Sequence, residues 1–220
     1  MSDPASHSLA WTSELLHPHD DPGKRRTALL QAAFDTVAET GFEGLRTRIV
    51  AERAGVNIAT LHYYFPSKQD LIEGLARLIG AKFVSLHGPS ALPSGFPALD
   101  RLRQEFSDVR FYLYQHPEML LVMQEFVLRG KRDPEVQKVV DQMNFYWHSG
   151  IERMVLRGVA DGVFRADIDP AVLVALLMAI FLGIPEISSD LIDSIQRTTE
   201  SWVLSDTVKQ RLTESQGAKA

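Results

Sequence analysis

The chain has 220 residues and no cysteine, so neither a disulfide framework nor a thiolate metal site is possible. It also lacks an apolar run of membrane-spanning length. The longest such run, Ala171 to Ile184, covers 14 residues and stops before Pro185, whereas a membrane helix needs about 20. No basic segment followed by an apolar one marks a secretory signal. We therefore expect a soluble, cytoplasmic protein that makes no contact with a membrane.

The sequence also lacks the short motifs of common enzyme chemistry. It has no Gly-x-Ser-x-Gly elbow, no Walker loop, no dinucleotide glycine fingerprint and no His-Glu-x-x-His zinc helix. His148 and Ser149 are adjacent, but neighbours on a helix point about 100° apart and cannot act together as base and nucleophile. His7, His17 and His19 have no partners at metal-ligand spacing. We predict no enzyme activity, no metal and no cofactor.

Strand-like alternation is absent as well, and hydrophobic residues recur with helical spacing from Lys24 onward. The first apolar stripe ends before Gly41, which is expected to cap that helix; its members are Leu29, Ala33, Phe34 and Val37. Further helices are predicted over about 67–86, 99–116, 118–128, 134–158, 170–184 and from 188 or 189 onward. Two of them begin with an aspartate followed by proline, which suits a cap and a first helical position. The sequence predicts an all-α fold.

The segment from Val50 to Phe65, VAERAGVNIATLHYYF, contains two short helices and a tight turn within 16 residues. Two steeply crossing helices need a small side chain where they come closest, and Ala51 supplies it. Gly55 suits the turn because it has no Cβ to resist a left-handed backbone. Asn57 stands where a helix N-cap would accept backbone N–H bonds. With apolar contacts from Val50, Val56 and Leu61, this is the spacing of a DNA-binding helix-turn-helix.

A longer stretch, Thr27 to about Ile79, resembles the N-terminal domain of TetR-family transcriptional regulators. The most specific feature is the run LHYYFPSK, residues 61–68, followed by Asp-Leu-Ile at 70–72. The resemblance implies an N-terminal three-helix domain that binds DNA and a C-terminal helical domain that binds a ligand and dimerises. One departure is Leu45, where the family often has a threonine that caps the next helix; we expect Thr47 to be the substitute cap.

Three residues of the second motif helix should face the major groove, because they lie opposite its apolar side: Ile58, Ala59 and His62. The family motif points to the same three. By the same resemblance, Arg48 matches a position that can reach a guanine, and Thr60, Tyr64 and Lys68 match phosphate-contacting positions. Arg46 and Thr47 are expected to add to this grip, and Asn57 lies in the same interface. By contrast, we expect Tyr63 in the core and Arg53 as a solvated surface charge.

The net charge of −5 at first argues against a nucleic-acid partner. Residues 24–68, however, carry seven basic and four acidic side chains, a net charge of +3, whereas residues 1–23 and 69–220 each carry −4. The basic residues are Lys24, Arg25, Arg26, Arg46, Arg48, Arg53 and Lys68. The positive block therefore coincides with the motif, as attraction to phosphate requires.

The remaining helices are rich in methionine and aromatic residues between Phe106 and Trp147. Such residues suit an adaptable apolar cavity, although they also suit a plain core. We predict a ligand lining from Met123, Phe126, Met143 and Trp147. The helix over 171–184 is apolar nearly all round, so it needs cover beyond its own domain. We predict a dimer interface from Leu177, Phe181, Leu191, Ile195 and Trp202.

These observations predict a disordered arm at 1–23, a helix-turn-helix domain at 24–68, a helical regulatory and dimerisation domain at 69–213 and a frayed tail at 214–220. The predicted protein is a homodimeric regulator, a repressor that a small apolar or aromatic effector releases from palindromic double-stranded operator DNA. One alternative is a DNA-organising protein that ignores small molecules. Another is a helical enzyme or interaction module whose helix-turn-helix is structural.

Overall fold

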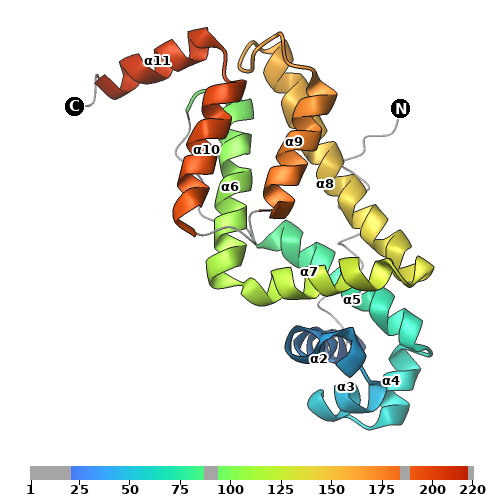
Figure 1. Ribbon diagram of the computed structural model, residues 1–220. Coiled ribbons are helices and arrows are strands. Elements are labelled where there is room, and N and C mark those ends of the chain that lie inside the picture. The colour runs from blue at the N-terminus through green and yellow to red at the C-terminus, as the bar shows by residue number, and fades with distance from the viewer. Residues whose placement is uncertain (1–20, 87–93, 184–188, 218–220) are drawn as a thin grey trace. The chain divides into compact units, whose positions relative to one another are not determined.

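The computed structural model describes residues 21–86, 94–183 and 189–217. Within these ranges the chain forms ten α-helices and no β-strand, so the prediction of an all-α fold is confirmed (Figure 1). None of the helices in the described ranges has both the length and the apolar character needed to cross a membrane.

The helices group into two compact units. The first contains α2 (Asp21–Gly44), α3 (Thr47–Arg53), α4 (Ile58–Tyr64), α5 (Lys68–Ser85), α7 (Pro117–Gly130) and the part of α8 (Pro134–Ala160) up to Asn144. The second contains α6 (Pro97–Gln115), the rest of α8, α9 (Pro170–Gly183), α10 (Ser189–Val203) and α11 (Asp206–Gly217). The compact units therefore divide the chain differently from the predicted boundary at residue 68, because α5 and α7 group with the helix-turn-helix.

The first predicted stripe lies where it was expected, on the buried side of α2. Leu29, Ala33 and Val37 are almost fully buried. The helical backbone is interrupted at Gly41, which has φ 66° and ψ −177°, and one further turn follows to Gly44. A side chain at Gly41 would be strained in this left-handed region. The predicted end of the first helical run is therefore confirmed.

The bend in α2 is held by α7, on which α2 packs more extensively than on α3 or α5. The backbone N–H of Phe42 donates to Oε2 of Glu125 at 2.9 Å. The ring of Phe42 also meets Phe126 edge to face, with 4.9 Å between the ring centroids. A Cβ built on Gly41 would lie 3.0 Å from the same carboxylate oxygen. Glycine at 41 thus serves both the bend and the approach of Glu125.

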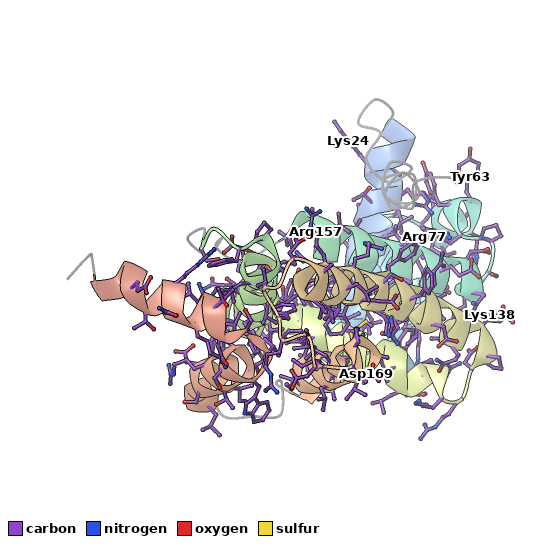
Figure 2. The ribbon with its side chains drawn as sticks, turned by 90° about the horizontal axis from the view of Figure 1, so that it is seen from above. Lys24, Tyr63, Arg77, Lys138, Arg157 and Asp169 are labelled. Carbon is purple, nitrogen blue, oxygen red and sulfur yellow. The ribbon has the colours of Figure 1, made fainter. Side chains whose placement is uncertain are left out.

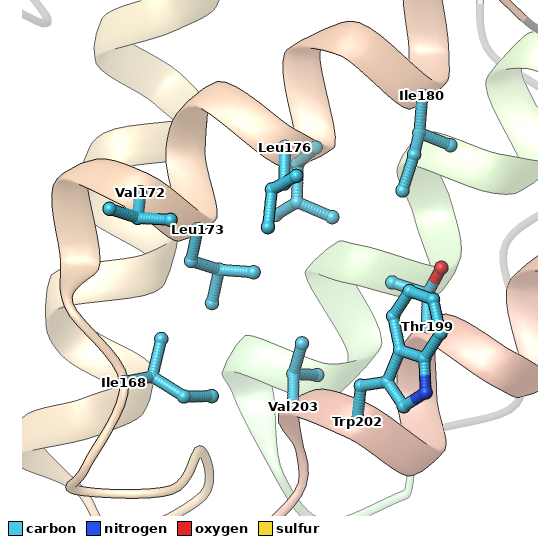
Figure 3. A pocket seen from close by; sticks show the side chains of 9 residues that line it. Ile168, Val172, Leu173, Leu176, Ile180, Thr199, Trp202 and Val203 are labelled. Carbon is cyan, nitrogen blue, oxygen red and sulfur yellow. The ribbon is translucent and has the colours of Figure 1, made fainter.

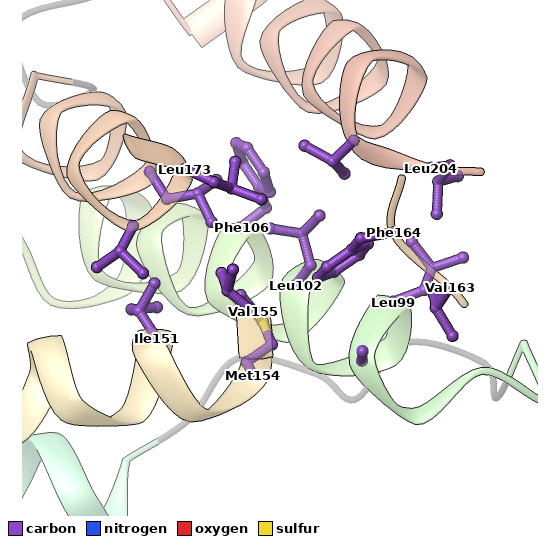
Figure 4. Packing of buried hydrophobic residues seen from close by; sticks show 14 of the residues in the cluster. Leu99, Leu102, Phe106, Ile151, Met154, Val155, Val163, Phe164, Leu173 and Leu204 are labelled. Atoms are coloured by element: carbon purple, nitrogen blue, oxygen red, sulfur yellow. The ribbon is translucent and has the colours of Figure 1, made fainter. Parts of the chain in front are cut away.

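The core of the second unit forms where α6, α8 and α9 bring their apolar faces together (Figure 4). Leu99, Leu102 and Phe106 repeat at steps of three and four along α6, and all three are fully buried. They belong to one cluster with Ile151 and Val155 of α8. The helix predicted over about 99–116 is confirmed as α6.

Two sets of contacts fix α10 within the second unit. Leu204, directly after α10, forms an isolated antiparallel bridge with Phe164, which follows α8. Glu200 of α10 accepts two hydrogen bonds from the guanidinium of Arg103 in α6, at 3.0 and 2.7 Å. One face of α10 is thereby held inward, while Trp202 remains exposed over 61% of its surface.

The C-terminal helices differ from the prediction. The helix expected from residue 189 ends at Val203, and α11 follows from Asp206 to Gly217. Val208 is buried in the core of the second unit, so α11 has an apolar anchor that keeps it ordered. Residues 214–217 of the predicted frayed tail are therefore helical, and residues 218–220 lie outside the described residues.

The N-terminal boundary differs in a similar way. Residues 1–20 of the predicted disordered arm lie outside the described residues. Residues 21–23 are part of α2, which begins at Asp21 rather than at Lys24. Pro22 accounts for the difference, because proline fits the first turn of a helix, where a backbone N–H has no partner.

Replacing Glu125 by alanine should lower the free energy of unfolding by about 1–3 kcal/mol, because the partly buried Phe42 N–H loses its acceptor. Glu125→Gln keeps an oxygen acceptor and should lose less. Urea denaturation followed by circular dichroism measures both. As a control, Glu135→Ala removes an exposed 2.7 Å pair with Lys138 and should change stability by under about 0.5 kcal/mol. Equal losses in the two Glu125 variants would contradict a role for this hydrogen bond.

Candidate nucleic-acid interface

The turn between α3 and α4 has the geometry that the sequence predicts. Gly55 adopts φ 67°, and Ala51 is buried where the two helices meet. The N–H of Val56 donates to the carbonyl of Ala51 at 2.9 Å, which closes the turn. Leu61 is fully buried and attaches α4 to the helices behind it. The predicted helix-turn-helix is confirmed.

The first turn of α4 is fixed by Asn57. Its side-chain oxygen accepts from the backbone N–H of Thr60 at 2.8 Å and from the Thr60 hydroxyl at 3.0 Å. The predicted N-cap is therefore confirmed. Asn57 and Thr60 were also predicted to contact DNA, and the structure shows that each already has a structural task. Their DNA contacts stay predictions.

A second cap fixes the start of α5, where Lys68 lies. The Ser67 hydroxyl accepts from the Asp70 N–H at 3.1 Å, and Asp70 accepts from the Ser67 N–H at 2.8 Å, which makes a capping box. Hydrogen bonds from the Ser67 hydroxyl and backbone lower the pKa of the Asp70 carboxyl. The cap therefore stabilises α5 above the ordinary titration range of aspartate and weakens as the pH falls through the lowered pKa. Lys68 is the first residue of α5 and is exposed.

The start of α3 corrects one prediction. Thr47 is the first residue of the helix and not its cap. The cap position belongs to Arg46, whose side chain makes no capping hydrogen bond. Leu45 is fully buried, so the position where the family often has a threonine contributes to the core instead. Arg46 and Arg48 both remain exposed.

Most of the predicted DNA-binding residues lie on the solvent side of α3 and α4. Arg46, Arg48, Asn57, Ile58, Ala59, His62 and Lys68 are exposed, and Thr47, Thr60 and Tyr64 are half-buried. Ile58 is notable because 41% of an apolar side chain is left in water. The structure thus leaves a mixed apolar and basic face available around α4.

The expectation that Tyr63 lies in the core is wrong. Its side chain is 80% exposed and meets Tyr64 edge to face, with ring centroids 5.1 Å apart. Leu61 and Phe65 are four residues apart and together occupy the buried side of this short segment, which leaves Tyr63 on the opposite side. The four-residue spacing of Leu61 and Phe65 could therefore have shown from the sequence that Tyr63 faces solvent.

Arg53 is exposed, as expected for a solvated surface charge, but it also has a partner. It forms a 2.5 Å ion pair with Glu39 of α2, and the hydrogen bond with Glu39 raises the pKa of the guanidinium. The two residues are 14 positions apart, so no helical spacing could have revealed the pair. Arg53 is therefore less available for DNA than Arg46 or Arg48.

The residues predicted to line a ligand cavity fall in different units. Met123, Phe126 and Met143 belong to the first unit, where Phe126 is fully buried against Phe42. Trp147 belongs to the second unit, where its indole N–H donates to Oε2 of Glu105 at 3.1 Å. The shared cavity stays a prediction.

Sequence reasoning missed a buried polar group on α6. Glu105 and Asp108 of α6 are buried, and neither was singled out from the sequence. Burial, together with the charges of Asp108 and Glu105, raises the pKa of the Tyr112 phenol. Trp147 and the guanidinium of Arg101 both contact the Glu105 carboxylate. The spacing of Glu105 and Asp108, at i and i+3, is the signal that could have shown a shared face.

An apolar groove of about 200 Å³ lies along α9 and α10 (Figure 3). Its lining contains one polar residue, Thr199; the other members are Ile168, Val172, Leu173, Leu176, Leu177, Ile180, Trp202 and Val203. Two predicted interface residues, Leu177 and Trp202, line this groove. Leu191 is also exposed, whereas Phe181 and Ile195 pack into or against the core.

Comparisons with known proteins agree with this architecture. The model of bacterial regulatory proteins of the tetR family matches residues 29–75. The model of the tetracyclin repressor-like C-terminal domain matches residues 99–198. The chain belongs to the TetR family of bacterial regulatory proteins.

Individual relatives are similar over part of the chain. It is 46% identical over 55 residues to the HTH-type transcriptional regulator RutR of Escherichia coli K12, which covers 25% of this chain and about a quarter (26%) of RutR. It is 33% identical over 95 residues to the HTH-type transcriptional repressor KstR of Rhodococcus jostii, and the match covers 43% of this chain and 43% of KstR. A crystal structure of a TetR-family transcriptional regulator from Rhodococcus sp. has a TM-score of 0.67 and 25% identity, covering 82% of this chain and 98% of that one.

Proposed function

We propose that this protein is a sequence-specific DNA-binding repressor that acts as a homodimer on a palindromic operator. The observation that carries the proposal is the exposed face of α4, which Gly55, Asn57 and Leu61 hold in helix-turn-helix geometry. A recognition helix of this kind presents base-reading residues to the major groove. Similarity to the repressor KstR supports repression rather than activation.

The chemistry of the exposed side chains assigns two kinds of contact. Ile58 and Ala59 have no hydrogen-bonding atoms in their side chains, so they read bases by pressing on thymine methyl groups. Arg48 suits the O6 and N7 atoms of guanine. Lys68 and the phenol of Tyr64 suit phosphate, and the exposed Tyr63 joins them. His62 serves either kind of contact, because its ring nitrogens can donate or accept.

Lys68→Ala should weaken binding to all DNA sequences alike, since phosphate contacts position a protein without reading bases. Arg48→Ala should instead relax the preference at one base pair, with a loss of about 1–3 kcal/mol on the preferred site. Selection from random DNA defines the site, and fluorescence anisotropy on matched and mismatched duplexes measures the preference. Altered preference in Lys68→Ala but not in Arg48→Ala would reverse the assignments, and an absence of sequence-specific binding by the wild type would refute the function.

We further propose that α9 and α10 pair with the same helices of a second copy. The supporting observation is the apolar groove between them, beside which Val172, Leu176 and Trp202 are each more than half exposed. Exposed apolar surface of this kind marks an interaction site. A two-fold dimer would mirror the two half-sites of a palindrome.

Trp202→Glu should give monomers that bind the operator poorly, because a charge would be placed in an apolar interface. Light scattering at micromolar concentration measures the mass, and anisotropy measures DNA binding. The matched control is Leu128→Glu on α7, since Leu128 is 63% exposed and Trp202 is 61% exposed. A monomeric wild type, or a dimer that survives Trp202→Glu, would contradict this interface.

We also propose that a small apolar or aromatic effector releases the protein from DNA. Supporting this is an aromatic cluster in the second unit, where the ring of Phe181 lies 5.1 Å from Phe106 and 6.1 Å from Trp147. The indole N–H is held by Glu105, so the Trp147 ring has a fixed orientation. Aromatic residues with one polar anchor are typical of ligand sites.

A thermal-shift screen of apolar and aromatic compounds, followed by operator binding with each hit, tests the effector. Trp147→Ala should abolish the response while leaving DNA affinity within about threefold, because Trp147 lies outside the first unit. An effector is expected to change operator affinity by roughly 5- to 150-fold, the usual range of allosteric coupling. If no hit changes operator affinity, a DNA-organising protein that ignores small molecules is the better interpretation.

A further inference from the structure

Two basic residues at the start of α2 have no role in the contacts described above. Lys24 and Arg25 are exposed, and neither makes an ion pair or side-chain hydrogen bond with any residue in the part of the chain that the structure describes. Arg53, by contrast, is paired with Glu39. The charge of the pair is therefore available to a partner from outside.

The position of this pair follows from its neighbour, Arg26. The Arg26 guanidinium lies over the ring of Phe65, 5.1 Å from its centroid. Phe65 is the C-cap of α4 and is fully buried. The second turn of α2 is therefore held against the end of the recognition helix α4. Arg25 and Lys24 come one and two residues before Arg26, so their side chains leave the helix about 100° and 200° round from this contact and reach water.

Tyr63 lies at the same end of α4 and is almost fully exposed. Figure 2 shows Lys24 on one side of the start of α2 and Tyr63 on the other. The two cations and the phenol are thus exposed on elements that meet at the end of α4. Ile58 and Ala59, which we assign to base reading, lie at the opposite end of α4.

We propose that Lys24 and Arg25, with Tyr63, bind the sugar-phosphate backbone of the DNA just outside the half-site that α4 reads. The inference rests on the proposed function and extends it to flanking DNA. An ammonium and a guanidinium suit phosphate oxygens, and a phenol can donate one further hydrogen bond. Such contacts do not read bases. The affinity should therefore depend on whether flanking DNA is present, but not on the sequence of that flanking DNA.

The variant Lys24→Ala with Arg25→Ala tests the proposal on the operator selected for the wild type. Each lost phosphate contact lowers the slope of log affinity against log salt by about 0.9. For two contacts, the advantage of the wild type should shrink about tenfold between 50 and 200 mM salt. Tyr63→Phe removes only the hydroxyl and should weaken binding with little change in the salt slope.

The matched control is Lys131→Ala with Arg132→Ala, because these residues form an equally exposed Lys-Arg pair between α7 and α8 in the same unit. It removes the same net charge and should leave the slope nearly unchanged. A second arm uses a duplex cut at the edges of the two half-sites. On this short duplex the wild type and the double variant should bind equally.

The outcomes distinguish a flanking phosphate contact from a general charge effect and from a failure of the proposed function. An unchanged salt slope in the Lys24 and Arg25 variant, while Arg48→Ala still relaxes base preference, would overturn the flanking contact and leave the proposed function standing. Equal slope losses in both double variants would also overturn it, by showing a general charge effect. If the wild type and the Lys24 and Arg25 variant bind the short duplex with equal affinity, the flanking contact is supported. Failure of the wild type to select any site would refute the proposed function itself.

Discussion

The ring of Phe65 is the contact on which the recognition helix depends. It ends α4 in a fully buried position, directly after the exposed Tyr63 and the half-buried Tyr64. It fits there because position 74 in α5 is glycine, where a Cβ would approach the ring to 2.9 Å. Arg26 covers the ring from α2. One side chain therefore joins α2, α4 and α5, and the residues proposed to read DNA keep their positions because it is buried.

A different constraint shapes the second unit, since α9 is apolar on more sides than its own core can cover. Leu173, Val174 and Leu177 are buried, whereas Val172 and Leu176 are more than half exposed. Contacts of α10 with α6 and with the segment after α8 leave the Trp202 side of α10 free. The groove along α9 and α10 is lined by apolar side chains apart from Thr199, and Thr199 is itself buried. Such a surface is costly in water, which is the physical reason to expect a second copy.

The sequence predicted the features that local chemistry controls. The cap at Asn57, the left-handed glycine at 55 and the apolar stripe of α2 all follow from spacing over a few residues. Features that depend on distant partners were missed or wrong. The pairing of Arg53 with Glu39 and the approach of Glu125 to Phe42, 83 residues away, leave no trace in a periodic pattern. The candidate ligand lining stays a prediction, because the pattern shows which residues are apolar but not which helices meet.

The contact between Glu125 and Phe42 bears on how an effector could act at all. An effector shifts DNA affinity only as far as it favours one conformation over another, and usual couplings amount to about 1–3 kcal/mol. One charge-assisted hydrogen bond at a partly buried site is of the same size. The helix α7 therefore does not need to leave the helix-turn-helix for a switch to operate. An effector that weakened this one bond would act within its usual coupling energy, while the packing of α7 on α2 remained.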